Sequence, residues 1–227
     1  MPNKMKEIAI VTGASKGIGL ALANKLLEQN YYVIGTSTSG NNEVISNSNF
    51  ELLQLNLGDN ESIKAFTAII AQRKIEVDLL INNAGIGPDL GFLFPEEKSY
   101  DETFEINTKG TVFFTEAMLV LMKKSSKIIN ISSGMGSISN CTGASSIAYC
   151  MSKTALNMYT KLLANRLEGI HDVVAIHPGW VQTTISSSNV NAPLTPEDSA
   201  NSIVKYLQNQ LKNGDYWDAE ANTLLSW

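Results

Sequence analysis

A tyrosine and a lysine four positions apart are the residues of this sequence best suited to moving a proton. Tyr149 and Lys153 stand near the start of a strongly helical pattern, so both side chains project from one helix face. A phenol with an ordinary pKa of about 10 is a poor acid at neutral pH, but a neighbouring ammonium favours the phenolate and lowers that pKa. The pair can therefore form a usable proton donor, although the same spacing more often gives an ordinary pair on a helix surface.

A glycine-rich turn could hold a phosphate group. The segment Thr-Gly-Ala-Ser-Lys-Gly-Ile-Gly, residues 12–19, directly follows an apolar run and opens into a helical pattern. Glycines let the backbone turn tightly and approach a pyrophosphate, whose charge is met by the free N–H groups and the dipole of the helix. Glycines also serve ordinary turns. The strand, turn and helix context therefore carries the prediction of a dinucleotide site.

The elements that must position these residues alternate between short apolar runs and longer helical patterns. This alternation predicts an α/β fold over residues 1–227, a single Rossmann-type doubly wound parallel sheet of about seven strands in the order 3-2-1-4-5-6-7, with helices on both faces. The predicted strands are Ile8–Val11, Tyr32–Ile34, Leu52–Leu55, Val77–Ile81, Lys127–Ile131 and Val173–Ile176. The predicted helices are Ile18–Gln29, Ser62–Lys74, Tyr100–Lys124, Tyr149–Leu167 and Pro196–Lys212. Irregular stretches at Gly134–Ile147 and Gln182–Thr195 follow strands, where such sheets bind ligands.

Composition argues against several classes of partner. The 17 basic and 22 acidic residues give a formal net charge of -5 without blocks of like charge, which disfavours nucleic acid and anionic membranes as main partners. The first residues lack a signal-peptide pattern and no apolar run reaches about 18 residues, so a cytoplasmic protein is expected. Cys141 and Cys150 are expected to be free thiols. His171 and His177 lack metal-ligand spacing, so no metal site is expected.

Six motifs follow one another in a distinctive order. They are the glycine turn, Asn82-Asn83-Ala84-Gly85, Asn107, Ser132-Ser133, Tyr149 to Lys153, and Pro178-Gly179. Over essentially the whole chain this order resembles the short-chain dehydrogenase/reductase family, and in particular its subgroup of sniffer-type carbonyl reductases and bacterial C-factor proteins. The resemblance implies an NADPH-dependent oxidoreductase that passes hydride between a nicotinamide ring and a carbonyl or alcohol.

The resemblance also implies catalytic roles. Ser133 would hydrogen-bond the substrate oxygen, Tyr149 would transfer the proton, Lys153 would bind the nicotinamide ribose and lower the tyrosine pKa, and Asn107 would anchor a proton-relaying water. Taken alone, Ser133 equally suits a turn cap and Asn107 an ordinary helix hydrogen bond. Ser137 is a rival to Ser133, because it lies closer to the family's usual spacing before the tyrosine.

Cofactor contacts follow from the same matching. NADP(H) is expected over NAD(H), because residues 35–39 hold no acid for the ribose hydroxyls, while Lys16, Ser37 and Thr38 can meet a 2′-phosphate. The arginine common near position 38 is missing, and Asn56 replaces the family's usual aspartate beside adenine. The implied contacts are Gly13, Ser15, Lys16, Ile18, Gly19, Ser37, Thr38, Asn56, Leu57, Asn83, Ala84, Gly85, Tyr149, Lys153, Pro178, Gly179, Val181 and Thr183.

The substrate and the partners are less defined. Ile86, Met135, Cys141 and Trp180 would roof a pocket for a small ketone, aldehyde or quinone, although Trp180 equally suits the core. Two helices carry more apolar residues than one stripe needs, which predicts a homodimer; these residues are Phe113, Phe114, Met118, Leu119, Leu156, Met158, Leu162 and Leu163. Alternatives to an enzyme are a non-catalytic NADP(H)-binding signalling protein of C-factor type and a purely structural protein. The intact set of four catalytic candidates favours the enzyme.

Overall fold

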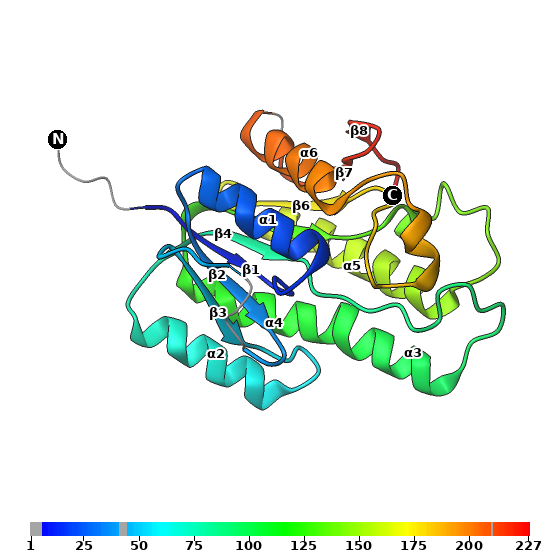
Figure 1. Cartoon of the computed structure of the whole chain (residues 1–227), viewed down its shortest axis with the longest axis horizontal. Helices are drawn as coiled ribbons and strands as arrows, with labels where there is room; N and C mark the ends of the chain where they lie inside the picture. Colours follow the sequence, from blue (N-terminus) through cyan, green and yellow to red (C-terminus); the bar gives the residue numbers. More distant parts are fainter. Residues whose placement is uncertain (1–5, 41–44, 210) are drawn as a thin grey trace.

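The described residues, 6–40, 45–209 and 211–227 of a computed structural model, contain one eight-stranded sheet in the order β3-β2-β1-β4-β5-β6-β7-β8 (Figure 1). The first seven strands pair in parallel and β8 pairs antiparallel with β7. The predicted order of seven strands is confirmed, with one short strand added at the edge. The strands are β1 Ile8–Val11, β2 Tyr32–Ser37, β3 Phe50–Gln54, β4 Val77–Asn82, β5 Met122–Ile131, β6 Asp172–His177, β7 Tyr216–Asp218 and β8 Thr223–Leu224.

Helices cover both faces of the sheet, as Figure 1 shows. Side chains of β1 alternate between two cores: Ala9 and Val11 pack with residues of α1 and α6, whereas Ile10 packs with Phe66 of α2 and Phe114 of α4. Burial on both faces explains why the central strands are short unbroken runs of aliphatic residues. The helices are α1 Gly17–Glu28, α2 Asn60–Gln72, α3 Glu97–Phe104, α4 Thr111–Met118, α5 Ile147–Arg166 and α6 Pro196–Asn209.

The segment predicted as one helix from Tyr100 to Lys124 differs from that expectation. It begins earlier, as α3, passes through a π-helical turn at Glu105–Gly110 into α4, and ends in a 3-10 turn at Leu119–Leu121. Strand β5 then begins at Met122, five residues before the predicted start, and Met122 pairs with Val77. The first half of β5 is rich in lysine and serine, so its sequence carries no apolar strand pattern.

The other differences are smaller. Helix α6 ends at Asn209 rather than Lys212, the predicted strand Ile8–Val11 is confirmed as β1, and the remaining predicted helices and strands differ from the observed ones by one to three residues at one or both ends. No predicted range covers β7 or β8, which have three and two residues and are too short to show a period. None of the helices in the described ranges combines the length and the apolar composition needed to cross a bilayer.

A chain of buried polar side chains ties the middle of the sheet to the helices. The amide Nδ2 of Asn82 donates to Asn130 Oδ1 and to Thr115 Oγ1, both at 2.8 Å. The Nδ2 of Asn130 in turn donates to Thr160 Oγ1 at 2.8 Å. Buried amides are costly unless they are paired. The network therefore fixes the ends of β4 and β5 relative to α4 and α5.

Candidate active site

The predicted site residues meet at the carboxyl edge of the sheet. The ends of the central strands lie in register there, because Val11 of β1 pairs with Gly35 and Ile81, and Ile131 of β5 pairs with Ile176 of β6. The loops that follow β1, β2, β4, β5 and β6 therefore all begin at the same edge of the sheet. Helix α5, which carries Tyr149 and Lys153, packs beside the turn that follows β5. This edge is the place where doubly wound sheets bind ligands.

The turn after β1 allows a close approach to the backbone. Gly13 and Gly17 have φ values of 67° and 56°, which glycine adopts at little cost. A Cβ on Gly19 would lie 2.2 Å from the carbonyl oxygen of Gly13 and 2.5 Å from Asn83 Nδ2, so no side chain fits. Helix α1 begins here without a side-chain cap and without an acid in its first turn. Its first N–H groups suit an anion, as the sequence predicts.

Thr12 joins this turn to the loop after β4. Its Oγ1 accepts hydrogen bonds from the backbone nitrogens of Asn83 and Ala84, each at 2.9 Å, and Asn83 Nδ2 donates to the carbonyl oxygen of Thr12 at 2.9 Å. Thr12 is a residue of the site that was not predicted from sequence. Its position as a hydroxyl residue directly before the first glycine is the one signal that marks it. Gly17 faces the loop after β6, since a Cβ there would lie 3.5 Å from Thr183 Cγ2.

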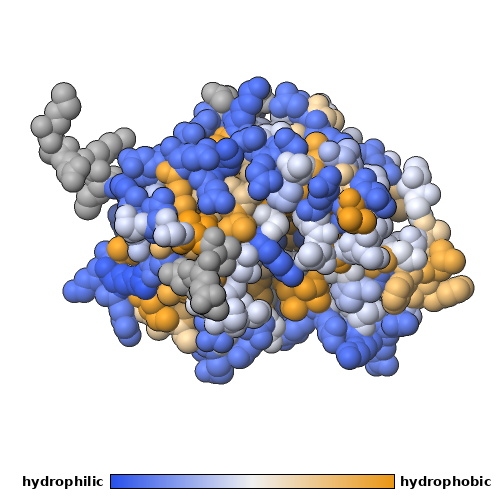
Figure 2. Space-filling view, viewed as in Figure 1, coloured by the Kyte–Doolittle hydropathy of each residue, from blue (hydrophilic) through white to orange (hydrophobic). Residues whose placement is uncertain are grey.

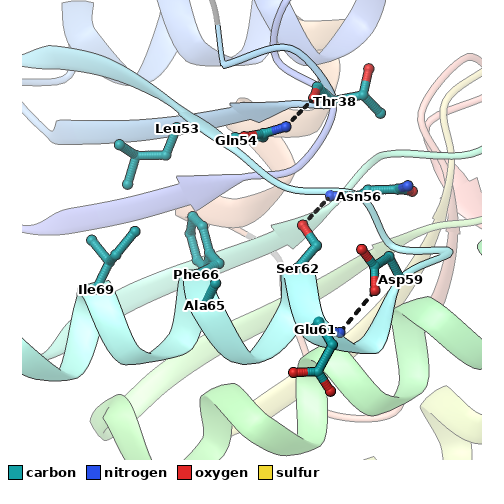
Figure 3. A pocket seen from close by; sticks show the side chains of 10 residues that line it. All are labelled: Thr38, Leu53, Gln54, Asn56, Asp59, Glu61, Ser62, Ala65, Phe66 and Ile69. Atoms are coloured by element: carbon teal, nitrogen blue, oxygen red, sulfur yellow. Dashed lines mark hydrogen bonds between the residues drawn. The ribbon is translucent and has the colours of Figure 1, made fainter.

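The residues predicted for the adenosine end lie in the turn after β1 and in the segments after β2 and β3. Thr38 and Lys16 are exposed, whereas Ser37 is buried and its hydroxyl accepts a hydrogen bond from Gly40 N at 2.9 Å. Ser37 therefore holds its own turn, and Thr38 is the more accessible hydroxyl. Figure 3 shows Thr38 and Asn56 lining a surface hollow of about 420 Å³ between β3 and α2.

Of the two predicted cofactor contacts after β3, Asn56 lies at the surface and Leu57 lies in the core. Asn56 is exposed, and its side-chain oxygen accepts a hydrogen bond from Gly58 N at 3.0 Å. Leu57 is buried in the core that the sheet forms with α2 and α4. A Cβ on Gly110 would lie 2.1 Å from the Leu57 carbonyl oxygen, so the π-helical turn packs directly against this backbone.

Tyr149, Lys153 and Ser133 come together around the first turns of α5. The Tyr149 and Lys153 side chains are almost fully buried, with 8% and 4% of their residue surfaces exposed. Lys153 Nζ donates to the carbonyl oxygen of Ile131 at 3.0 Å and lies 5.7 Å from the centre of the Tyr149 ring. The Ser133 side chain lies near enough to the Tyr149 phenol to lower its pKa through hydrogen bonding. The geometry thus joins the end of β5 to the helix through both candidate catalytic side chains.

Burial dominates the electrostatics of this group. It raises the pKa of Tyr149 to about 12, although the hydrogen bond with Ser133 acts in the opposite direction. Burial also lowers the pKa of Lys153 to about 8. The expectation that Lys153 brings the tyrosine pKa below its ordinary value is therefore wrong for this structure, because removal of water disfavours the charged form of each group. The phenol is held protonated at neutral pH.

Ser133 and Ser137 have different partners, and these favour Ser133 as the candidate catalytic serine. The Ser137 hydroxyl donates to the carbonyl oxygen of Ser226 at 2.6 Å. Ser133 caps the 3-10 turn at Gly134–Gly136 by accepting from Met135 N at 3.2 Å, and it also contacts Tyr149. The hydroxyl of Tyr216, in β7, donates to the Ser133 carbonyl oxygen. Tyr216 was missed from sequence because its strand is too short to be recognised.

Asn107 lies within the π-helical turn and holds the loop after β4. Its Nδ2 donates to the carbonyl oxygen of Ile86 at 2.8 Å, and its Oδ1 accepts from Ile86 N at 2.8 Å. A Cβ on Gly85 would lie 3.2 Å from Asn107 Oδ1 and 3.4 Å from Lys153 Nζ, so these two side chains meet at Gly85. Single π-helical turns are frequent at functional sites. The sequence did not predict the π-helical turn at Glu105–Gly110.

The loop after β6 borders the site beside the glycine turn, where Thr183 faces Gly17. Pro178 is buried and its carbonyl oxygen accepts from the Ser199 hydroxyl at 2.7 Å. Gly179 has φ 88°, and a Cβ there would lie 2.5 Å from Leu194 Cδ1. Val181, which is buried, forms a β-bridge with Leu194.

Apolar side chains line the loops around the site. Trp180 is 48% exposed and therefore lies outside the core, and its backbone nitrogen donates to Glu220 Oε2 at 3.0 Å. Met135 is exposed as well, as are Phe92, Leu93 and Phe94 in the loop after β4. Figure 2 shows apolar surface gathered at the end of the molecule where the loops after β4 and β5 project.

The two cysteines and the two histidines are chemistry-bearing groups with no predicted catalytic role. Cys141 and Cys150 are both free thiols. His171 is tied to the Ser126 hydroxyl at 2.9 Å, whereas burial lowers the pKa of His177. Among the residues that the structure describes, no three His, Cys, Asp or Glu side chains form a group able to hold a metal ion.

Comparisons with known proteins agree with this geometry. The family model described as short chain dehydrogenase matches residues 7–193. The chain is 34% identical over 188 residues to 3-oxoacyl-[acyl-carrier-protein] reductase FabG of Escherichia coli (strain K12), which covers 79% of this chain and 75% of that protein.

Two solved structures share nearly the whole fold. NADPH-bound carbonyl reductase from chicken fatty liver superposes with a TM-score of 0.87 at 28% identity, covering 98% of this chain and 94% of the other. Carbonyl reductase Sniffer of D. melanogaster gives 0.85 at 29% identity, covering 98% and 100%. Because the family match spans the glycine turn as well as the helix of Tyr149 and Lys153, the chain belongs to the short-chain dehydrogenase family of oxidoreductases.

Proposed function

We propose that the protein is an NADPH-dependent carbonyl reductase that converts a small ketone, aldehyde or quinone to its alcohol, or runs the reverse reaction. The observation that carries the proposal is the buried Tyr149 phenol, which lies beside Ser133 and Lys153 at the carboxyl edge of the sheet. A reductase must add a proton to an oxygen, and a protonated phenol in a dry site can supply it. The similarity to a carbonyl reductase solved with NADPH supports the choice of cofactor.

The backbone fits a dinucleotide. The space beside Gly19 excludes any side chain, and the first turn of α1 has neither a cap nor an acid to compete with an anion. Bound NADPH would supply the hydride for the reaction. Holding it would fall to Gly13, Ser15, Lys16 and Ile18 at the pyrophosphate, to residues 83–85 and 178–183 around the nicotinamide, and to Lys153 at its ribose.

The four polar side chains would share the work on the carbonyl group. Ser133 and Tyr149 would both hydrogen-bond the substrate oxygen, and Tyr149 would transfer its proton there as negative charge develops. Lys153, cationic below pH about 8, would stabilise the phenolate left behind, and a charge in a water-poor site acts more strongly than one in water. Asn107 would keep the loop at Ile86 in place. Near Gly85, where its side chain approaches that of Lys153, it would also hold a water that passes protons back toward Lys153.

Cofactor preference and assembly are parts of the same proposal. Lys16 and Thr38 are exposed at the adenosine end, and residues 35–39 contain no carboxylate that would repel a 2′-phosphate, so NADPH is expected to bind more tightly than NADH. Phe113 of α4 and Met158 and Leu162 of α5 are exposed, whereas Phe114, Met118 and Leu163 pack in the core beneath the sheet and Leu156 is also buried. This surplus apolar surface supports a homodimer formed through α4 and α5.

A panel of carbonyl compounds tests the function. Purified protein is mixed with NADPH and with ketones, aldehydes or quinones of increasing size, and the loss of NADPH absorbance is followed. Turnover of at least one compound class is expected. A protein that binds NADPH but turns over no member of a broad panel would instead fit the non-catalytic signalling alternative.

A further inference from the structure

A buried aspartate caps the helix that carries Tyr149. Asp89, in the loop after β4, is only 1% exposed. One carboxylate oxygen accepts from Ala148 N at 2.8 Å, and both oxygens accept from Tyr149 N at 3.2 Å. These are N–H groups of the first turn of α5, and they lie 59 and 60 positions away in the sequence. A carboxylate at this place also interacts favourably with the positive end of the helix dipole.

Helix α5 has no cap of its own. Its N-cap residue, Ser146, has a left-handed backbone with φ 61° and makes no side-chain bond to the helix. The Ser146 hydroxyl accepts from Gly91 N at 2.9 Å, and Ser146 N donates to the Phe92 carbonyl oxygen at 2.8 Å. The two segments therefore secure each other. The loop after β4 supplies the missing cap, and the start of α5 supplies partners for the loop.

The same loop contacts the Tyr149 ring. A Cβ on Gly87 would lie 3.1 Å from Tyr149 Cδ2 and 2.5 Å from Leu90 Cδ1, so the backbone at Gly87 lies close to the ring. At its start the loop is fixed through Ile86, which forms two hydrogen bonds with Asn107. The Tyr149 backbone and ring are thus both in contact with the segment between Ile86 and Phe92.

We propose that Asp89 is a positioning residue for the proton donor: by binding the first N–H groups of α5 it sets where the Tyr149 hydroxyl stands relative to Ser133 and Lys153. The inference rests on the proposed reductase function. Proton transfer depends steeply on the placement of the donor, and small displacements of reacting groups cost large factors in rate.

The charge of Asp89 has a second, measurable consequence. Its carboxylate favours the neutral phenol and contributes to the raised pKa of Tyr149, as do Cys150 and Tyr216, while burial remains the main cause. Lys153, at the ring, is the one cation in contact with the phenol among the described residues. Removing the Asp89 charge is therefore expected to move the Tyr149 pKa downward.

Two substitutions separate position from charge. Asp89→Ala removes both the acceptor and the charge, whereas Asp89→Asn keeps one acceptor oxygen and removes the charge. Asp78→Ala is the matched control, because Asp78 also accepts a backbone hydrogen bond, from Ile8 N at 2.9 Å, but it lies at the start of β4, at the opposite edge of the sheet. Each variant is measured for unfolding, NADPH affinity, kcat across pH, and amide hydrogen exchange.

The expected results are specific to the first turn of α5. In Asp89→Ala, the Ala148 and Tyr149 amides should exchange about tenfold faster and kcat should fall about tenfold to a hundredfold, with NADPH affinity changed less than about twofold. Asp89→Asn keeps an acceptor oxygen without the charge, so its kcat and its exchange rates at Ala148 and Tyr149 should lie between those of the wild type and those of Asp89→Ala. Asp78→Ala should alter neither kcat nor the exchange of these two amides.

A merely structural role would lower the unfolding midpoint and leave kcat per folded molecule unchanged. Folded Asp89→Ala with normal kcat and normal exchange at Ala148 and Tyr149 would overturn the proposal. If Asp89→Ala does not fold, Asp89→Asn decides, and wild-type kcat together with wild-type exchange at Ala148 and Tyr149 would then count against the proposal. Absence of turnover in the wild type would contradict the reductase function alone, because the exchange comparison needs no substrate.

Discussion

Replacing Tyr149 by phenylalanine tests the chemistry with the loss of one oxygen atom. Phe keeps the ring, which is buried against the loop after β4, and removes the hydroxyl that neighbours Ser133. A hydrogen bond is worth about 0.5–1.5 kcal/mol, and removing a buried polar group offsets part of such a loss, so the free energy of unfolding should change by less than about 1 kcal/mol. The fold and the dinucleotide turn should therefore survive.

The effect on turnover should be far larger than the effect on stability. General acid catalysis contributes about 10²–10⁴-fold, which corresponds to about 2.7–5.5 kcal/mol of transition-state stabilisation. Because Lys153, at 5.7 Å from the ring centre, stays in place, NADPH affinity should change less than about threefold. Turnover is followed by NADPH absorbance with the best compound of the panel, and affinity by NADPH fluorescence.

Tyr159→Phe is the matched control on the same helix. Tyr159 lies ten residues further along α5, and its hydroxyl donates to Glu116 Oε1 at 2.9 Å, away from the sheet edge that holds the site. It should lose a hydrogen bond and keep its kcat. A folded Tyr149→Phe variant with wild-type NADPH affinity and wild-type kcat would refute the proton-donor assignment, and with it the mechanism proposed above.

Three further predictions concern the same residues and surfaces. Burial lowers the pKa of Lys153 to about 8, so above that pH the unfolded chain holds a proton that the folded chain has lost. The free energy of unfolding should thus gain about 2 kcal/mol from this group between pH 8 and pH 10, and denaturant titrations of Lys153→Met should lack that gain. Gly19→Ala should weaken NADPH at least about tenfold, because its Cβ would meet the Gly13 carbonyl oxygen; normal affinity by titration would contradict the assignment of the turn. Light scattering should give a dimer mass for the wild type and a smaller mass for Leu162→Lys, and a wild-type monomer at micromolar concentration would exclude the proposed interface.

Local patterns predicted the parts of the molecule whose cause is local. The β1 strand and the turn that follows it need only an apolar run and glycines in a helix-opening position, and both were placed from sequence. The spacing of Tyr149 and Lys153 put them on one helix face. The start of β5 could not be predicted in this way, because Lys123 and its neighbours extend the strand through pairing with β4 and an ion pair with Asp78.

The direction of the tyrosine pKa was missed for a different reason. Sequence shows that a lysine is near, and charge alone predicts a lowered pKa. Burial is a property of the folded chain, and the packing around Tyr149 and Lys153 removes the water that would stabilise either ion. A protonated phenol and a lysine that gives up its proton near pH 8 remain suited to a donor that must first hold a proton and then be recharged.

Asn107, Tyr149 and Ser133 are each held by a residue distant in the sequence. Asn107 is bound to Ile86, 21 positions away, the Tyr149 backbone to Asp89, 60 positions away, and the Ser133 backbone to Tyr216, 83 positions away. None of these partners has a signature within its own segment. The parallel sheet brings them together because the loops that follow β4 and β5 leave the same edge, and β7 extends that edge beyond β6. Substitutions at such partners should therefore reduce turnover without touching a reacting atom, which is why the positioning of Tyr149 by Asp89 can be tested separately from its chemistry.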